Sequence, residues 1–426
     1  MRRRIIAGIG AGSFGMAINT GIQFVSLPIF LHYWDTSTYG VWLMLSAIPA
    51  YLSMADVGMV TAAGNRMTMA QGKDDPAEAN RVFQSTAVLI VSICASLAVL
   101  IVPLILWVPL HWLRSVDQRL ALSFLCLNVL ITLISGLPES IFRSTQRYAF
   151  GTLLGNSARL AEWCGSMLGL ALVGSFAAVA LGGLVVRIMS LVTGIMLTRT
   201  HNNGIEWGVK HANRNEIIAM IKPALSFMAF PLANALSFQS LTLLVGNVFG
   251  PSTVAIFNTY RTIARVSVQI TAIFSHSLWP EFSRLFAANY PQAINKLFRQ
   301  ANLLGGAQAV LLSVVLYFTS PWLIRVWTHG AIPFVPALML LMLLYASVGG
   351  LWHISRILLM ATNQHSGLAY WALATGAVSI ILAWALSHML GVSGVVVAML
   401  LSESLIAIIC FNLAQATLAQ RRSVAT

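Results

Sequence analysis

The sequence predicts an all-α membrane protein in which about twelve helices cross the bilayer. Hydrophobic residues make up 58% of its 426 residues and charged residues only 9%, whereas soluble proteins average about 45–50% and about 25%. The mean hydropathy is +0.80. The apolar residues also gather into runs of roughly 20 residues, the length at which a helix crosses the hydrocarbon core. This composition excludes an ordinary soluble enzyme, a disordered chain and a coiled coil.

The apolar runs define the expected spans in order along the chain. The first follows three arginines and continues to about residue 31, which is too long for the apolar part of a cleaved signal peptide. The later runs are joined by short connections, and none of these is long enough to form a soluble domain with its own core. The expected spans cover residues 6–31, 39–63, 82–108, 120–141, 150–172, 175–198, 223–249, 254–279, 301–322, 335–360, 367–387 and 393–414.

Basic residues predict the orientation of these spans, because cytoplasmic loops carry an excess of lysine and arginine. With the N-terminus inside, only Arg114, Arg119 and Arg325 fall on the outer side. Seventeen basic residues fall on the cytoplasmic side, in both termini and in the loops 64–81, 142–149, 199–222 and 280–300. We therefore expect both termini in the cytoplasm. The net charge of +13 is then explained by basic residues on the cytoplasmic side of the membrane, and it does not indicate nucleic-acid binding.

The loop 199–222 divides the expected spans into two sets of six. An even number of spans gives both sets the same orientation, so a duplication would produce a parallel repeat. The hairpin segments Trp34–Trp42 and Phe249–Phe257 occupy equivalent places in the two sets and resemble each other weakly. We expect four parts: an N-terminal six-helix bundle at 1–198, a cytoplasmic linker at 199–222, a C-terminal six-helix bundle at 223–414 and a cytoplasmic tail at 415–426.

Five arginines remain inside the expected spans, namely Arg159, Arg187, Arg261, Arg265 and Arg356. A charged side chain at the bilayer centre costs about 2.5–3.5 kcal/mol on insertion scales, so these side chains should face a shared, hydrated cavity. Arg261 and Arg265 are one turn apart and share a helix face. Guanidinium groups suit phosphate and carboxylate, so the pattern favours a substrate-binding cavity for an anion. The alternatives are pairing with buried acids, most directly between Arg159 and Glu162, and extension of Arg356 to the inner interface.

Other polar residues in the spans are candidates for ion coupling or for lining the cavity. Asp56, Glu162 and Glu403 could bind a proton or another cation. Asp56 could equally fix the packing of the first two spans. Asn19 and Gln23 share a face of the first span, where they either line the cavity or bond to other helices.

No catalytic constellation is present in the sequence. It contains no GxSxG nucleophile motif, no HExxH motif, no Walker A loop and no Cys/His metal cluster. We therefore expect no enzyme activity, no cofactor, no metal and no ATP hydrolysis by the chain itself.

Several segments together resemble a known family. In chain order these are Ser26–Phe30, Tyr39–Trp42, Tyr51–Gly58, Phe142–Tyr148, Phe249–Pro251 leading to Tyr260 and Arg261, Pro280–Arg284, and Trp327–Gly330. Each segment is a loose match, but their order and spacing extend over nearly the whole chain. In these features the sequence resembles the polysaccharide transporter family, the Wzx-like lipid-linked oligosaccharide (O-antigen) flippases of the MOP superfamily.

The resemblance implies two six-helix bundles around a central cavity that opens alternately to either side of the bacterial cytoplasmic (inner) membrane. The implied substrate is an undecaprenyl-pyrophosphate-linked glycan, moved from the cytoplasmic to the periplasmic leaflet for O-antigen, lipopolysaccharide, capsule or exopolysaccharide synthesis. The pyrophosphate would bind among the arginines while the prenyl tail stays in the lipid bilayer. A proton or another cation is the implied coupling ion. A polysaccharide polymerase and the chain-length machinery are the implied protein partners.

Two other functions are compatible with a polytopic chain. A cation-coupled drug or metabolite antiporter of the MATE-like branch shares the architecture, but organic cations call for acidic or aromatic cavities, and here five arginines face three or four acids. A glycan polymerase or ligase uses the same lipid carrier. Such enzymes usually need a sizeable outer loop for the acceptor, and the outer loops here are short.

Overall fold

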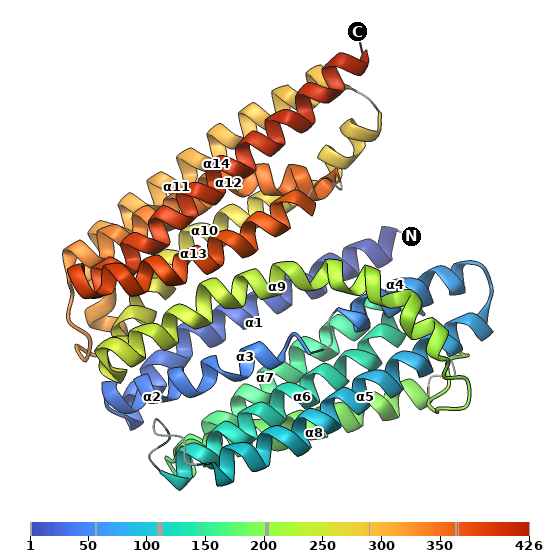
Figure 1. Ribbon diagram of the computed structural model, residues 1–426, viewed down its shortest axis with the longest axis horizontal. Coiled ribbons are helices and arrows are strands. Elements are labelled where there is room, and N and C mark those ends of the chain that lie inside the picture. The colour runs from blue at the N-terminus through green and yellow to red at the C-terminus, as the bar shows by residue number, and fades with distance from the viewer. Residues whose placement is uncertain are drawn as a thin grey trace. The chain divides into compact units, whose positions relative to one another are not determined.

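The structure is a computed structural model that describes residues 2–55, 58–108, 113, 115–145, 147–200, 204–288, 290–362, 364 and 366–425. Within these residues the regular structure is helical throughout, with no strand, which confirms the expected all-α class (Figure 1). The chain forms two compact units. Unit 1 comprises Met1–Asp35 and Leu45–Met228, and unit 2 comprises Thr36–Met44 and Ala229–Thr426.

Most helices belong wholly to one unit. Unit 1 contains α1 (Arg2–Tyr33), α3 (Pro49–Leu52), α4 (Met59–Gly72), α5 (Pro76–Trp107), α6 (Val116–Ser144), α7 (Tyr148–Leu172) and α8 (Phe176–Thr200). Unit 2 contains α10 (Pro251–Ala287), α11 (Pro291–Trp327), α12 (Pro336–Ala361), α13 (Ser366–Leu390) and α14 (Val392–Ala425). The chain enters unit 2 between Asp35 and Thr36 and returns to unit 1 inside α2 (Thr36–Ala47). It enters unit 2 again inside α9 (Arg214–Phe249).

Every expected span coincides with helical structure, but the span at 39–63 is not continuous. It consists of α2, α3 and α4. Pro49 begins α3, and proline cannot donate the backbone hydrogen bond that a continuing helix requires. Gly58 precedes α4 with a φ of 75°, a left-handed conformation that glycine adopts without steric cost. Asp56, a candidate for ion coupling, lies outside the described residues.

Nine described helices are long and apolar enough to cross a membrane, which supports a multi-pass membrane protein. They fall in α1, α5, α6, α8, α9, α11, α12, α13 and α14. The interrupted span at 39–63 offers no helix of sufficient length. The other two expected spans are α7, which carries Arg159 and Glu162, and α10, which carries Arg261 and Arg265. Charged side chains lower the mean hydropathy of these two helices. The two helices are therefore absent from the nine because of the same residues that make them candidates for the functional site.

Small residues allow close helix packing in unit 1. Helix α8 packs along both α6 and α7. Where α7 meets α8, a Cβ atom on either Gly165 or Gly182 would overlap the carbonyl group of the other. Close backbone approach of this kind is a main source of association between helices in lipid. A buried apolar cluster that includes Met67, Phe83 and Ile141 joins α4, α5 and α6.

The expected linker at 199–222 is mostly ordered structure packed onto α5. Helix α9 already begins at Arg214, so the connection is shorter than the apolar pattern predicts. The side chain of Asn80 donates to the Gly204 carbonyl oxygen and accepts from the Glu206 amide. Gln84 in turn donates to the Glu206 carbonyl oxygen over 3.0 Å and accepts from the His211 amide over 2.7 Å. We call residues 204–213 the strap.

In unit 2, α14 packs against α12 and α13, and α12 packs against α10 and α11. Pro251 and Pro336 begin α10 and α12, at positions where the missing N–H would have no helical partner in any case. The segment Thr36–Met44 belongs to this unit, and Gly40 lies so close to Pro251 that a Cβ atom would overlap its carbonyl group. The start of α2 therefore packs directly against the start of α10.

Candidate functional site

A carboxylate on α7 connects three helices of unit 1. Glu162 accepts a hydrogen bond from Arg187 Nη2 of α8 at Oε2, and one of 2.6 Å from Asn128 Nδ2 of α6 at Oε1. The Arg187 side chain is 10% exposed and the Glu162 side chain 18%, so the two charges offset each other away from bulk water. Two buried atoms, Arg187 Nε and Asn128 Oδ1, have no hydrogen-bond partner among the described residues. The network therefore retains unused bonding capacity.

Arg159 bonds to a different helix from Glu162, although the two residues are three positions apart on α7. Its Nη1 donates to Asn19 Oδ1 of α1 over 2.7 Å. Residues three apart on a helix differ by about 60° in direction, which is enough for them to reach different neighbours. The structure thus pairs Glu162 with Arg187 and leaves Arg159 exposed beside Asn19. Gln23, one turn further along α1, is half-buried.

A cavity of about 220 Å³ lies among α6, α7 and α8. Arg159 and Arg187 both line it. Polar lining groups are supplied by Thr132, Ser135, Asn156 and Ser190. Glu139 is the acid in its wall, and its carboxylate lies 3.8 Å from Arg143 Nη2. The two arginines and the uncharged polar groups give this cavity the chemistry of an anion site.

Arg261 of α10 is almost fully buried, with only 2% of the residue exposed. Its guanidinium donates to the Phe238 carbonyl oxygen over 3.0 Å, to Thr242 Oγ1 over 2.7 Å and to Asn258 Oδ1. The guanidinium carbon also lies 3.5 Å from the centre of the Phe238 ring, within range of a cation–π interaction. Phe238 and Thr242 belong to α9, so Arg261 joins α9 to α10 through uncharged partners.

Arg265, one turn further along α10, has a different environment. The residue is exposed, and its guanidinium carbon lies 4.8 Å from the centre of the same Phe238 ring. The sequence treats Arg261 and Arg265 as equivalent because they share a helix face. In the structure Nη1 and Nη2 of Arg261 donate to groups within the protein, whereas Arg265 is exposed on unit 2.

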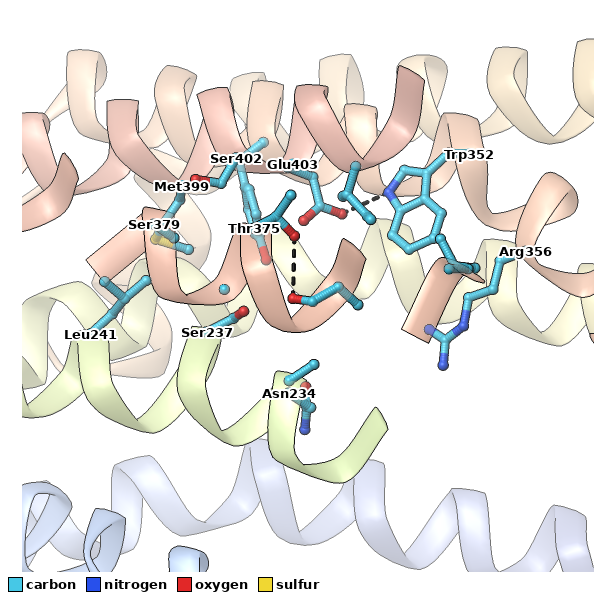
Figure 2. Close-up of a pocket in the computed structure, with 16 residues that line it drawn as sticks. Asn234, Ser237, Leu241, Trp352, Arg356, Thr375, Ser379, Met399, Ser402 and Glu403 are labelled. Carbon is cyan, nitrogen blue, oxygen red and sulfur yellow. Dashed lines mark hydrogen bonds between the residues drawn. The ribbon is translucent and has the colours of Figure 1, made fainter. Parts of the chain in front are cut away.

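A second cavity, of about 250 Å³, lies inside unit 2 among α9, α12, α13 and α14. Figure 2 shows Glu403 of α14 and Arg356 of α12 in its wall. Trp352 Nε1 donates a 2.8 Å hydrogen bond to Glu403 Oε1. Hydroxyl groups are supplied by Ser237, Thr375, Ser379 and Ser402. The Ser402 hydroxyl is buried and has no hydrogen-bond partner in the part of the chain that the structure describes. This cavity combines one carboxylate, from Glu403, and one guanidinium, from Arg356, with uncharged hydroxyl and amide groups.

The candidate residues thus fall into separate groups. Arg187 meets Glu162, Arg159 meets Asn19, Arg261 and Arg265 share Phe238, and Arg356 and Glu403 line one cavity. Sequence reasoning missed Asn128, Asn258 and Trp352. A search for amides inside apolar spans would have found Asn128, and Asn258 lies three residues before Arg261 on the same helix. Nothing in the local sequence marks Trp352 as a partner of Glu403.

Residues 5–286 match the family described as polysaccharide biosynthesis proteins. The chain belongs to this family. The match confirms the resemblance to the polysaccharide transporter branch of the MOP superfamily. No curated protein sequence matches the chain significantly.

Solved structures show the same fold. An inward-facing multidrug resistance MATE family transporter of the MOP superfamily is 11% identical with a TM-score of 0.81, covering 98% of this chain and 100% of its own. An outward-facing MATE family transporter of the same superfamily is 12% identical with a TM-score of 0.67, covering 99% and 96%. A MOP superfamily transporter from Pyrococcus furiosus, described as having a binding pocket of reverse polarity that suggests a different function, is 11% identical with a TM-score of 0.68, covering 98% and 96%. Family and fold are those of membrane transporters and not of enzymes.

Proposed function

We propose that this membrane transporter is a flippase for an undecaprenyl-pyrophosphate-linked oligosaccharide. It moves the glycan from the cytoplasmic to the periplasmic leaflet by alternating access, for the synthesis of a surface polysaccharide such as O-antigen, capsule or exopolysaccharide. The observation that carries the proposal is the family match combined with arginines inside the helices of both units. The family match supports a glycan as the substrate, and the guanidinium groups offer binding sites for its pyrophosphate.

The environments of the arginines support different roles in this function. Arg159 and Arg265 are exposed, so their guanidinium groups are accessible to an anion. Arg187 lines the unit 1 cavity beside its carboxylate partner and is a second contact for the pyrophosphate. Arg261 holds α9 and α10 together and supports Arg265. Asn19 orients Arg159, and Gln23 lies on the same helix.

Coupling to a proton or another cation is assigned to Glu162 and Glu403. Each carboxylate accepts a hydrogen bond from a neighbouring helix. Glu403 lines the unit 2 cavity, and Arg187, the partner of Glu162, lines the unit 1 cavity. Arg356 shares the unit 2 cavity and contributes charge compensation or a substrate contact there. Asp56 is retained as a third coupling residue on the sequence pattern alone.

The same proposal defines the cellular setting. The protein lies in the bacterial inner membrane with both termini in the cytoplasm, as the distribution of basic residues favours. Two six-helix bundles, at 1–198 and 223–414, would alternate around a central cavity, joined by the segment 199–222 and followed by the tail 415–426. A polysaccharide polymerase and chain-length machinery would receive the flipped glycan.

The second candidate is a cation-coupled drug or metabolite antiporter, because the solved structures with this fold include multidrug MATE transporters. Their identity to this chain is only 11–12%, so they support the fold and not the substrate. The arginines argue against organic cations, since a guanidinium repels a cation and attracts an anion. Transport of a cationic dye by the purified protein would favour this second candidate.

The test is made in cells that lack the chromosomal gene. Loss of the protein should abolish surface glycan and cause the lipid-linked precursor to accumulate in the cytoplasmic leaflet. Arg159→Ala and Arg265→Ala should reproduce this defect while the protein still reaches the membrane. Arg284→Ala is the matched control, because Arg284 is an exposed arginine on α10 that pairs with Glu281. Normal surface glycan in the deletion strain would overturn the proposal.

A further inference from the structure

We propose that Glu162, Asn128 and Arg187 form a proton-operated release for an anion-binding arginine. The charged carboxylate of Glu162 holds the guanidinium of Arg187, and a proton taken up by Glu162 frees that guanidinium to bind an anion in the unit 1 cavity. The inference rests on the proposed function in one respect only, namely that the anion is the pyrophosphate of the lipid-linked glycan.

The geometry makes the Glu162 carboxylate and an incoming anion alternative partners for the guanidinium of Arg187. Glu162 is the acid that pairs with Arg187 among the described residues. A proton removes the negative charge and turns one carboxylate oxygen from an acceptor into a donor. Arg187 would then be a buried cation without a counter-ion, which is strongly unfavourable. An incoming anion restores the balance, so the proton and the anion promote each other's binding.

Asn128 is suited to both protonation states of Glu162. Its Nδ2 donates to the carboxylate over 2.6 Å, while its Oδ1 is buried without a partner in the described part of the chain. A side-chain amide carries a donor on one side and an acceptor on the other. Rotation by about half a turn would present Oδ1 to a protonated Glu162 and accept its O–H. Asn128 is therefore a positioning residue that keeps Glu162 in place before and after proton uptake.

The released arginine already lines a cavity that can receive the anion. Arg187 and Arg159 line this cavity together, and Arg187 Nε has no partner among the described residues. The titratable groups around Glu162 on the helices packed against it are few. Helix α8 contributes Arg187, α6 contributes Glu139 at the cavity wall with Arg143 beside it, and α1 has no ionisable residue in 10–31. Glu162 is thus the acid in direct contact with the arginine.

Anion binding to the purified full-length protein tests the release. The probe is P1,P2-dimethyl pyrophosphate, a diester whose charge is constant over the pH range used. Titration calorimetry at about pH 5.5 and about pH 8 should show roughly tenfold tighter binding by the wild type at the lower pH, the scale of an ordinary coupling energy. Glu162→Gln mimics the protonated acid, so it should bind the probe tightly at both pH values.

Three further variants make the test specific. Glu206→Gln removes an exposed acid of unit 1 that does not line this cavity, and it should keep the wild-type pH dependence. Glu162→Gln combined with Arg187→Gln should lose the tight binding. Glu162→Asp shortens the carboxylate, so it should bind the probe more tightly than the wild type at the higher pH. An unchanged pH dependence in Glu162→Gln, or an equal loss of it in Glu206→Gln, would overturn the release.

Proton uptake gives a second, independent measurement. In weakly buffered solution with an indicator dye, the wild type should take up protons when the probe binds, and Glu162→Gln should not. These assays do not involve the glycan, so they can succeed when the precursor fails to accumulate in the deletion strain. That combination would overturn the proposed function and leave the proton-operated release standing.

Discussion

Trp352 Nε1 donates a hydrogen bond of 2.8 Å to Glu403 Oε1, and this bond joins α12 to α14 at the edge of the unit 2 cavity. The carboxylate that we assign to ion coupling is therefore positioned by an indole from another helix. Gly349, one turn before Trp352, leaves room for it, because a Cβ atom there would lie 3.1 Å from Glu403 Oε1. Two residues of α12 thus define the place of one acid on α14.

Trp352→Phe keeps the aromatic ring but removes the donor. Loss of a hydrogen bond to a charged group should lower the free energy of unfolding by about 1.5–3 kcal/mol. Thermal unfolding of the purified protein in detergent measures the change. Trp384→Phe is the control, since Trp384 is 59% exposed on α13. Equal stability of the two variants would contradict the role given to this bond.

Arg261→Lys should destabilise the protein, whereas Arg265→Lys should not. A lysine ammonium is a single point charge and cannot reach the Phe238 carbonyl oxygen, Thr242 and Asn258 in the way a guanidinium does. We expect a loss of roughly 2–4 kcal/mol for Arg261→Lys from hydrogen bonds left unmade. Thermal unfolding compares the two variants, and glycan display reports their function. If Arg265→Lys unfolds as early as Arg261→Lys, the structural role is not specific to Arg261.

The strap at 204–213 should loosen when Gln84 is replaced by Ala. The substitution removes one bond to the Glu206 carbonyl oxygen and one from the His211 amide. Two neutral hydrogen bonds contribute about 1 kcal/mol each, so the strap should open about thirtyfold more often. Limited proteolysis with trypsin at Lys210 and Arg214 measures this opening. Asn302→Ala is the control, because the Asn302 amide donates to the Phe298 carbonyl oxygen of its own helix. Cleavage at the wild-type rate in Gln84→Ala would show that the strap is held by other contacts.

The membrane fold could be predicted from the sequence because it depends on summed hydropathy. An apolar run of sufficient length must become a helix in lipid, since only a helix satisfies its own backbone hydrogen bonds. The break in the second span was not foreseen. A proline such as Pro49 often only kinks a helix, so its presence does not predict a break. The further interruption at Gly58 depends on how the chain packs around it.

The candidate site could be predicted only as a set of residues. Charge inside an apolar span identified Arg187 and Glu162, because buried charge is costly wherever it occurs. Their pairing could not be predicted, because it depends on how α7 and α8 are rotated about their axes. The same limit applies to Arg261 and Arg265, which sequence spacing treats as equivalent and tertiary packing separates into a buried and an exposed residue.

The placement of Thr36–Met44 in unit 2 has a consequence for biosynthesis. Gly40 leaves the ribosome well before Pro251, the residue against which it packs. During synthesis, the start of α2 is therefore inserted before α10, the helix against which it packs. It lacks this contact while the helices from α3 to α9 are inserted. A nascent chain arrested before α10 would expose the close-packing surface around Gly40. We expect this segment to be the part of the N-terminal half that most needs protection by the insertion machinery.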